Sequence, residues 1–352
     1  MSTELVSISL YTLLIAYTSV GNLRQWAERR LLALPNERSS HTRPTPSGGG
    51  VAIVLPALFG LLIFAYLRER LTLPLGIVLL GGLGIAAISW LDDLYTLANR
   101  TRFAIHLASA LLVIVGLGAI QHVALPLLPA IPLGWLGFVV TLVWIVGLIN
   151  AYNFMDGIDG LAGSQAVIAG LAWAWFGQQL HDDVITVLGL VLAASSLGFL
   201  GYNWPPARIF MGDVGSAFLG YNFAILAVLA RQHDARMACV ALLIVWPFVF
   251  DTLFTVVRRW HRGENVFVAH RSHLYQRLVI AGHSHRTVTL LYAGLALIGV
   301  LLSMGWYRNI PGCAMAILCV IPALAIGLWL TVMYYEAKAL LVAPLTHQQK
   351  MG

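Results

Sequence analysis

Long apolar runs separated by short polar segments make up most of the chain. A transmembrane helix needs about 20 consecutive, predominantly apolar residues. Runs that approach this length fall near residues 5–21, 49–67, 73–91, 103–120, 133–150, 160–176, 184–201, 214–230, 237–257, 287–305 and 312–333. The pattern predicts an all-α polytopic membrane protein with about 11 transmembrane helices, forming a single membrane domain over residues 1–352.

Composition supports the bilayer as the solvent of this chain. Apolar residues make up 59% of the 352 residues and charged residues only 10%, whereas a soluble domain has roughly 25% charged residues. A soluble protein of this size could not bury so much apolar surface.

Basic residues orient the predicted helices. If successive spans alternate in direction, the loops fall into two sets, and 16 of the 21 Lys and Arg residues lie in one set. Cytoplasmic loops carry such an excess of positive charge. We therefore expect the N-terminus outside and the C-terminus in the cytoplasm. The expected cytoplasmic loops cover about residues 22–48, 92–102, 150–160, 202–213 and 258–286.

An acidic pair lies at this cytoplasmic end. Asp92 and Asp93 follow an apolar run, and the partial negative charge of a helix C-terminus makes two carboxylates costly there unless a cation offsets them. A bound Mg²⁺, Arg100 or Arg102 could supply that charge. Simple solvation of two loop carboxylates is the alternative.

Two further segments combine aspartates with glycines. Segment 150–165 reads NAYNFMDGIDGLAGSQ, and its glycines let the backbone approach a ligand closely. Segment 202–216 reads YNWPPARIFMGDVGS. In it, Asp213 either caps the next helix or brings an anion or a metal to that helix N-terminus, and Phe210 could stack on a base.

Two basic loops complete this face. Segment 38–50 reads RSSHTRPTPSGGG and is either a linker or an anion-binding loop. The longest cytoplasmic loop contains VAHRSHLYQRL, whose histidines and arginines could bind phosphate or a transition metal. Zinc is disfavoured because no cysteine lies nearby, and the carboxylate-rich loops favour a hard ion such as Mg²⁺.

Asp251 stands apart because it follows Pro247 within an otherwise apolar run. A charge at membrane depth costs at least about 2.5 kcal/mol on insertion scales. We therefore expect a partner or a water-filled cleft beside Asp251, and proline can break the helix at this point.

Aspartates, basic side chains and glycine-rich loops on one face suit phosphoryl transfer. A divalent cation can bridge a diphosphate and offset charge as the bond breaks, while basic groups position the phosphates. A lipid acceptor could present its head group there while its chain stays in the bilayer. The sequence contains no Walker A loop and no evident serine nucleophile with a His/Asp pair, so a metal-dependent phosphotransferase is the economical interpretation.

The motifs resemble those of the polyprenyl-phosphate N-acetylhexosamine-1-phosphate transferases, glycosyltransferase family 4. The resemblance runs from Arg38 to about Arg277 and rests on PTPSGGG, the Asp92–Asp93 pair, NFMDGIDGLAG and FMGDVGS, in that order. It implies an enzyme of the bacterial inner (plasma) membrane with a cytoplasmic active site and Mg²⁺ as cofactor, with Mn²⁺ as a possible substitute. The implied reaction transfers a sugar-1-phosphate from a UDP-N-acetylsugar to undecaprenyl phosphate and releases UMP.

The same resemblance implies residue roles. Asp92, Asp93 and Asp213 would be catalytic, with Asp213 and Asp93 as metal ligands. Direct attack by the lipid phosphate, with Asp92 or Asp93 assisting deprotonation, is favoured over a covalent aspartyl intermediate. The residues implied for the nucleotide are Asn153, Asp156, Gly157, Ile158, Asp159, Asn203 and Phe210, and Phe210 would stack on the uracil. The residues expected to bind phosphate or sugar groups are His41, Arg43, Arg102, His270, Arg271 and His273.

The late loop, which we define as the predicted cytoplasmic loop of about residues 258–286, departs from familiar family members. Enzymes that use UDP-GlcNAc tend to show a DRxHLHH-like segment, and muramoyl-pentapeptide enzymes a run of histidines. Here Tyr275 and Gln276 stand where histidines would be expected. The chain looks more like the branch that initiates O-antigen (lipopolysaccharide) synthesis with UDP-FucNAc or UDP-QuiNAc, and a UDP-GlcNAc enzyme initiating another envelope glycan is the alternative.

Two other classes fit the sequence less well. A transporter or flippase of lipid-linked sugars would want ionisable groups at mid-membrane, and only Asp251 is a candidate. A non-catalytic scaffold has no use for so many glycine-flanked aspartates. No nucleic-acid partner is expected, and the sequence does not decide between a monomer and a homodimer.

Overall fold

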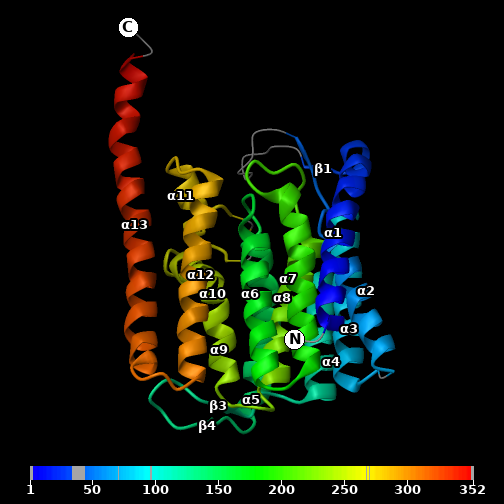
Figure 1. Cartoon of the computed structure of the whole chain (residues 1–352). Coiled ribbons are helices and arrows are strands. Elements are labelled where there is room, and N and C mark those ends of the chain that lie inside the picture. The colour runs from blue at the N-terminus through cyan, green and yellow to red at the C-terminus, as the bar shows by residue number, and fades with distance from the viewer. Residues whose placement is uncertain are drawn as a thin grey trace.

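The computed structural model describes residues 3–33, 44–69, 71–95, 97–266, 268 and 270–349, with side chains described as far as residue 339. The described chain is almost entirely helical (Figure 1). The first helices are α1 (Thr3–Arg30), α2 (Val51–Leu67), α3 (Leu73–Tyr95), α4 (Asn99–Leu117), α5 (Leu136–Phe154), α6 (Leu161–Gln179) and α7 (Asp183–Asn203). They are followed by α8 (Asp213–Ala230), α9 (Met237–Ile244), α10 (Trp246–His261), α11 (Leu274–Ile280), α12 (His285–Tyr307) and α13 (Cys313–Gln349).

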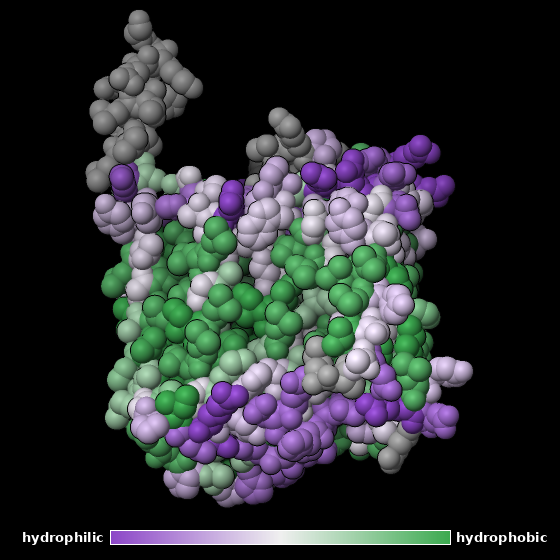
Figure 2. Space-filling view, viewed as in Figure 1, coloured by the Kyte–Doolittle hydropathy of each residue, from purple (hydrophilic) through white to green (hydrophobic). Residues whose placement is uncertain are grey.

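The all-α polytopic prediction is confirmed. Eight helices of the described chain are long and apolar enough to cross a membrane, and α9 with α10 can count as a ninth, bent span. The shorter apolar α2 and the less apolar α6 coincide with the two remaining predicted runs. Figure 2 shows a broad hydrophobic belt between two hydrophilic ends, as expected for a bundle that faces lipid.

Helix α8 forms the centre of the bundle. Every residue from Val214 to Ala230 is buried, and α8 packs against α3, α5 and α9, among others. A helix that is apolar all round is stable only when neighbours cover all its faces. The residues at the start of α8 are therefore held in a fixed place at one end of the bundle.

Two small antiparallel pairs mark the opposite ends of the bundle. β1 (Leu32–Ala33) pairs with β2 (Thr45–Pro46) near the end of α1, and β3 (His122–Val123) pairs with β4 (Ile131–Pro132) at the other end (Figure 1). The end that carries β1 and β2 holds the loops predicted to be cytoplasmic. Which end faces the cytoplasm stays a prediction.

The predicted loops are shorter in the structure because several helices extend into them. α1 continues to Arg30, and α3 continues to Tyr95 so that Asp92 and Asp93 lie in its last turn. The short helix α11 occupies part of the late loop. The predicted single span over 237–257 is bent by 78° between α9 and α10, and Pro247 stands in the first turn of α10, where a missing backbone N–H costs nothing.

Candidate active site

The glycines after β2 let two distant segments meet. The N–H of Gly49 donates to the carbonyl of Phe210 (2.8 Å), and the N–H of Gly50 donates to the carbonyl of Met211 (2.7 Å). A Cβ on Gly50 would collide with the backbone of Gly215. The motif PTPSGGG therefore serves here as a close-packed support for the segment that precedes α8.

Asp92 and Asp213 share one arginine. Arg102 on α4 contacts Asp92 through Nη1 and Asp213 through Nη2, each at 2.7 Å. The other oxygen of Asp92 accepts the backbone N–H of Leu97 at 2.6 Å. Asp92 and Asp213 thus share a bridging guanidinium, which orients the two carboxylates toward each other.

Asp93 caps the central helix. Its carboxylate accepts hydrogen bonds from the backbone N–H groups of Asp213 (3.0 Å) and Val214 (3.1 Å). The residue at the N-cap position is Gly212, with φ +75° and no side chain to cap the helix. Asp213 is therefore not the cap of its own helix, and its carboxylate is available for other contacts.

Asn203 and Asp159 tie together the loops after α5 and α7. Asn203 accepts the N–H of Gly160 (2.9 Å) and donates to the carbonyl of Ile209 (2.9 Å). Asp159 accepts the N–H of Ala207 at 3.0 Å. These bonds join the segments NFMDGIDG and YNWPPARIF into one surface.

A cavity with a volume of about 260 Å³ opens on this surface. Its lining includes all seven residues predicted for the nucleotide, together with Asp213. The lining residues that were not predicted to be site residues are Ser47, Met211, Gly212, Gln276 and His285. The structure thus brings the predicted nucleotide residues together with Asp213, at the end of the bundle that carries Arg102.

The pKa of Asp156 reflects the acidic surroundings of the cavity. Burial, and then the negative charges of Asp213, Asp93 and Asp159, raise the pKa of this loop carboxyl well above its usual range. A group whose neutral form is favoured by neighbouring carboxylates marks a place where added positive charge would be stabilising.

The donor set fits a hard divalent cation. Among the described residues, no three His, Cys, Asp or Glu side chains form a ready-made cage for a metal. Mg²⁺ does not need one, because it is usually bound through one or two carboxylates, water and substrate phosphates. Asp213 can contribute a carboxylate oxygen. Each oxygen of Asp93 accepts one backbone N–H group of α8 and keeps a further lone pair.

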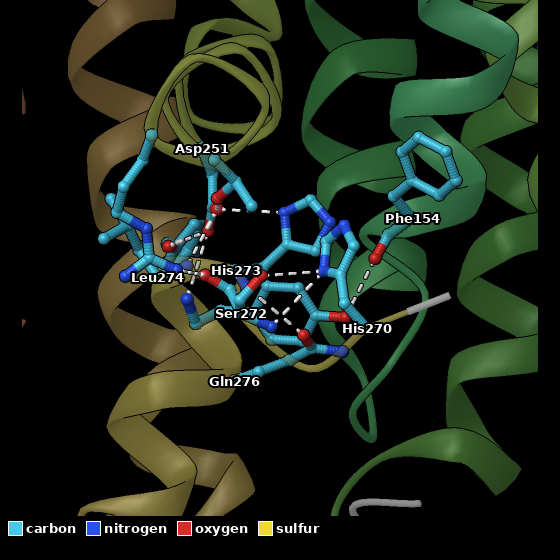
Figure 3. Close-up of polar contacts among 11 residues, drawn as sticks. Phe154, Asp251, His270, Ser272, His273, Leu274 and Gln276 are labelled. Carbon is cyan, nitrogen blue, oxygen red and sulfur yellow. Dashed lines mark hydrogen bonds and ion pairs between the residues drawn. The ribbon is translucent and has the colours of Figure 1, made fainter. Parts of the chain in front are cut away.

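His270 and His273 of the late loop contact each other, His273 also contacts Asp251, and neither histidine lines the cavity (Figure 3). His273 is only 3% exposed, and its Nδ1 lies 3.1 Å from the carboxylate of Asp251. His270 contacts the hydroxyl of Ser272 at 2.9 Å. None of His270, Arg271 and His273 is among the described residues that line the cavity, so the structure does not bring them to the predicted donor site.

The remaining residues predicted to bind phosphate or sugar groups, and one residue that was not predicted, lie in different places. His41 and Arg43 lie outside the described residues. Arg102 lies with the acidic residues, as described above. His285 was not predicted as a site residue, yet it pairs with Asp159 at 3.2 Å. The sequence signal for this role is only its place at the start of α12, on the predicted cytoplasmic side.

The fold and the site define a polytopic membrane protein with a cavity at one end that is lined by Asp156, Asp159 and Asp213. Comparison with known proteins agrees. The family model Glycosyl transferase family 4 matches residues 75–231. A probable undecaprenyl-phosphate N-acetylglucosaminyl 1-phosphate transferase of Bacillus subtilis (strain 168) is 34% identical over 274 residues, 77% of this chain and 75% of the relative.

Two further relatives cover similar lengths. The decaprenyl-phosphate N-acetylglucosaminephosphotransferase of Mycobacterium tuberculosis (strain ATCC 25618 / H37Rv) is 33% identical over 84% of this chain and 81% of its own. The phospho-N-acetylmuramoyl-pentapeptide-transferase of Symbiobacterium thermophilum is 33% identical over 74% and 81%. The chain belongs to the polyprenyl-phosphate N-acetylhexosamine-1-phosphate transferase superfamily, glycosyltransferase family 4.

Proposed function

We propose that this membrane enzyme transfers an N-acetylhexosamine-1-phosphate from a UDP-sugar to undecaprenyl phosphate and releases UMP. The observation that carries the proposal is the cavity in which Asp213 and seven residues of two separate loops meet. The names of relatives that use polyprenyl phosphates and N-acetylsugars support the same reaction. In this proposal the cavity faces the cytoplasm of a bacterial inner membrane, where nucleotide sugars are available.

The nucleotide half of the donor occupies the glycine-rich side of the cavity. Phe210 stacks on the uracil, because an aromatic ring binds the face of a base. Asp159 is held by Ala207 and His285, so its carboxylate is oriented before the base arrives. Preorganised polar groups bind a ligand with less loss of entropy.

The reaction is a direct displacement at phosphorus. An oxygen of the lipid phosphate forms a bond to the phosphorus that carries the sugar, the bridging P–O bond breaks, and UMP leaves with the electron pair. Asp92 or Asp93 accepts the proton of a lipid phosphate that arrives protonated. Arg102, beside both Asp92 and Asp213, positions phosphate oxygens by charge and hydrogen bonding.

Asp213 would hold the divalent cation. When bound, Mg²⁺ would supply the positive charge that offsets the diphosphate during bond breaking. Asp93 fixes the start of α8 and thereby the position of Asp213.

The donor we favour is a deoxy-N-acetylhexosamine such as FucNAc or QuiNAc, which would make this enzyme the first step of O-antigen synthesis. The support is the segment HRSHLYQ, in which Gln276 lines the cavity at a position where a histidine is expected. The names of two relatives, which specify N-acetylglucosamine, favour UDP-GlcNAc as the second candidate.

A donor panel tests the proposal. Purified protein is incubated with undecaprenyl phosphate, Mg²⁺ and either UDP-GlcNAc, UDP-FucNAc, UDP-QuiNAc or UDP-MurNAc-pentapeptide, and the lipid product is identified by mass spectrometry. We expect lipid diphosphate-linked sugar with one of the first three donors, and the fastest rate with a deoxy sugar. A faster rate with UDP-GlcNAc would identify UDP-GlcNAc as the donor. Product from none of these donors would refute the proposed reaction.

A further inference from the structure

Asp251 lies at the centre of a buried network outside the cavity (Figure 3). Its side chain is 0% exposed. The donors around its two oxygens are His273 Nδ1 (3.1 Å), Leu274 N (2.8 Å), Tyr275 N (3.1 Å), Tyr292 Oη (2.6 Å) and Thr255 Oγ1 (3.2 Å). A buried carboxylate is stable only when such donors replace its water, and this set satisfies the expectation of a partner at this depth.

Three of these donors come from the start of α11. They are the imidazole of His273 and the backbone N–H groups of Leu274 and Tyr275. Tyr292 adds a contact from α12. Asp251, which lies on α10, therefore fastens α11 to two other helices.

Helix α11 in turn forms a wall of the cavity. Gln276 lines the cavity, and its Oε1 accepts the N–H of His273 at 3.3 Å. Tyr275 donates to the carbonyl of Phe154 at 2.8 Å, at the end of α5. A Cβ on Gly157 would collide with the Tyr275 hydroxyl and lie 3.3 Å from Nε2 of Gln276. The loop that carries Asp156 and Gly157 thus rests directly on the residues that follow His273.

We propose that Asp251 is a positioning residue for the sugar-nucleotide donor: it holds α11 so that Tyr275 and Gln276 support the 155–160 loop and close one wall of the cavity. The inference rests on the proposed function for its kinetic readout. Because Asp251 makes no contact with the cavity itself, it acts through Gln276 and Tyr275. The same arrangement explains why His273 is buried: its imidazole contacts Asp251 and does not line the cavity.

Kinetics of Asp251→Asn test this role. The amide keeps one acceptor oxygen but presents an NH₂ group to donors, so the attachment of α11 is weakened. We expect the KM for the UDP-sugar to rise about tenfold, while the KM for undecaprenyl phosphate changes less than about twofold. Thr255→Val is the matched control, because it removes a hydrogen bond to the same carboxylate from within α10 and leaves α11 attached. A donor KM that is unchanged in Asp251→Asn, or equally raised in Thr255→Val, would overturn the proposal.

A double-mutant cycle with Gln276→Ala separates positioning from general stability. If Asp251 acts through Gln276, the double variant has a donor KM close to that of the more affected single variant, because residues in one network are non-additive. Multiplicative effects of the two substitutions would overturn the proposal. Should Asp251→Asn fail to fold, Tyr292→Phe removes the hydroxyl that donates to Asp251 at 2.6 Å and also contacts the backbone N–H of Tyr275, and a donor KM raised about threefold is expected. An unchanged donor KM in folded Tyr292→Phe would contradict the role.

Hydrogen exchange gives a readout that does not depend on the reaction. In Asp251→Asn or Tyr292→Phe, peptides covering 273–280 and 155–160 should exchange faster than in the wild type, while peptides at the start of α8 should not change. Unchanged exchange in both of the first two segments would overturn the structural part of the inference. An inactive wild-type protein with the expected exchange pattern would instead refute only the proposed function.

Discussion

The carboxylate of Asp93 accepts a hydrogen bond from the backbone N–H of Asp213 at 3.0 Å, although the two residues are 120 positions apart in the sequence. This bond joins the last turn of α3 to the first turn of α8. It fixes the carboxylate of Asp213 beside Arg102 and at the edge of the cavity. The acidic pair is therefore part of the framework of the site as well as part of its charge.

Substitution of Asp93 by alanine should reduce both stability and activity. The loss of a helix cap costs about 0.5–2 kcal/mol, and Asp213 also loses its fixed position. The matched control is Asp182→Ala, because Asp182 also accepts two backbone N–H groups of a helix start, those of Val184 and Ile185 (both 2.9 Å), but as the N-cap residue of its own helix, α7. We expect both variants to lower the melting temperature, but only Asp93→Ala to lower kcat per folded molecule by more than about tenfold. Equal kcat values would contradict this role.

Phe210 should matter for the donor and not for the lipid. Base–aromatic stacking is worth about 1–3 kcal/mol, so Phe210→Ala should raise the donor KM and the inhibition constant of UMP about 5- to 150-fold. Phe210→Trp retains an aromatic face and should stay close to wild type in both constants. A UMP inhibition constant that does not change in Phe210→Ala would exclude stacking on the base.

The contact between Gly50 and Gly215 should not tolerate a methyl group. A Cβ at Gly50 would collide with the backbone of Gly215, whereas a Cβ at Gly84 has no neighbour within 4 Å. Overpacking of this kind costs about 1–3 kcal/mol or more. Gly50→Ala should therefore lower the melting temperature in detergent, and Gly84→Ala should not. Equal thermal stability of the two variants would show that the segments carrying Gly50 and Gly215 can move apart without loss of stability.

Asp156 should make cation binding depend on pH. Its pKa is raised well above the usual range by burial and by neighbouring carboxylates, so at pH values between 3.8 and the raised pKa it keeps a proton that a bound cation would displace. The folded state loses stability as the pH rises through that raised pKa, and added Mg²⁺ offsets the loss. We expect the Mg²⁺ concentration for half-maximal activity to fall as the pH rises, with a weaker dependence in Asp156→Asn. The same pH dependence in both proteins would assign the titration to another group.

The architecture could be predicted because apolar runs report directly on burial in a bilayer. The position of the break near Pro247 also followed from the sequence. The 78° bend and helix α11 could not be predicted from the sequence. Helix α11 has only seven residues, too few for a periodic apolar pattern, and its position depends on hydrogen bonds to Asp251.

The resemblance of the motifs predicted that the site residues cluster, and all seven residues predicted for the nucleotide line one cavity. Gln276 and His285 were missed as cavity residues, since their positions depend on how α11 and α12 pack against the 155–160 loop. The capping of α8 by Asp93 was missed for the same reason. Contacts between segments more than 100 residues apart leave no local pattern to read.

Lipid-dependent release of UMP tests the central claim most directly. Purified protein with its UDP-N-acetylsugar and Mg²⁺ should release UMP only when undecaprenyl phosphate is present, with one molecule of lipid-linked sugar diphosphate formed for each UMP. Asp213→Asn, in a folded protein, should reduce this rate by about a hundredfold or more, as expected when a group that stabilises the transition state is lost. UMP release without the lipid, or a rate in Asp213→Asn within a few-fold of the wild type, would contradict the account.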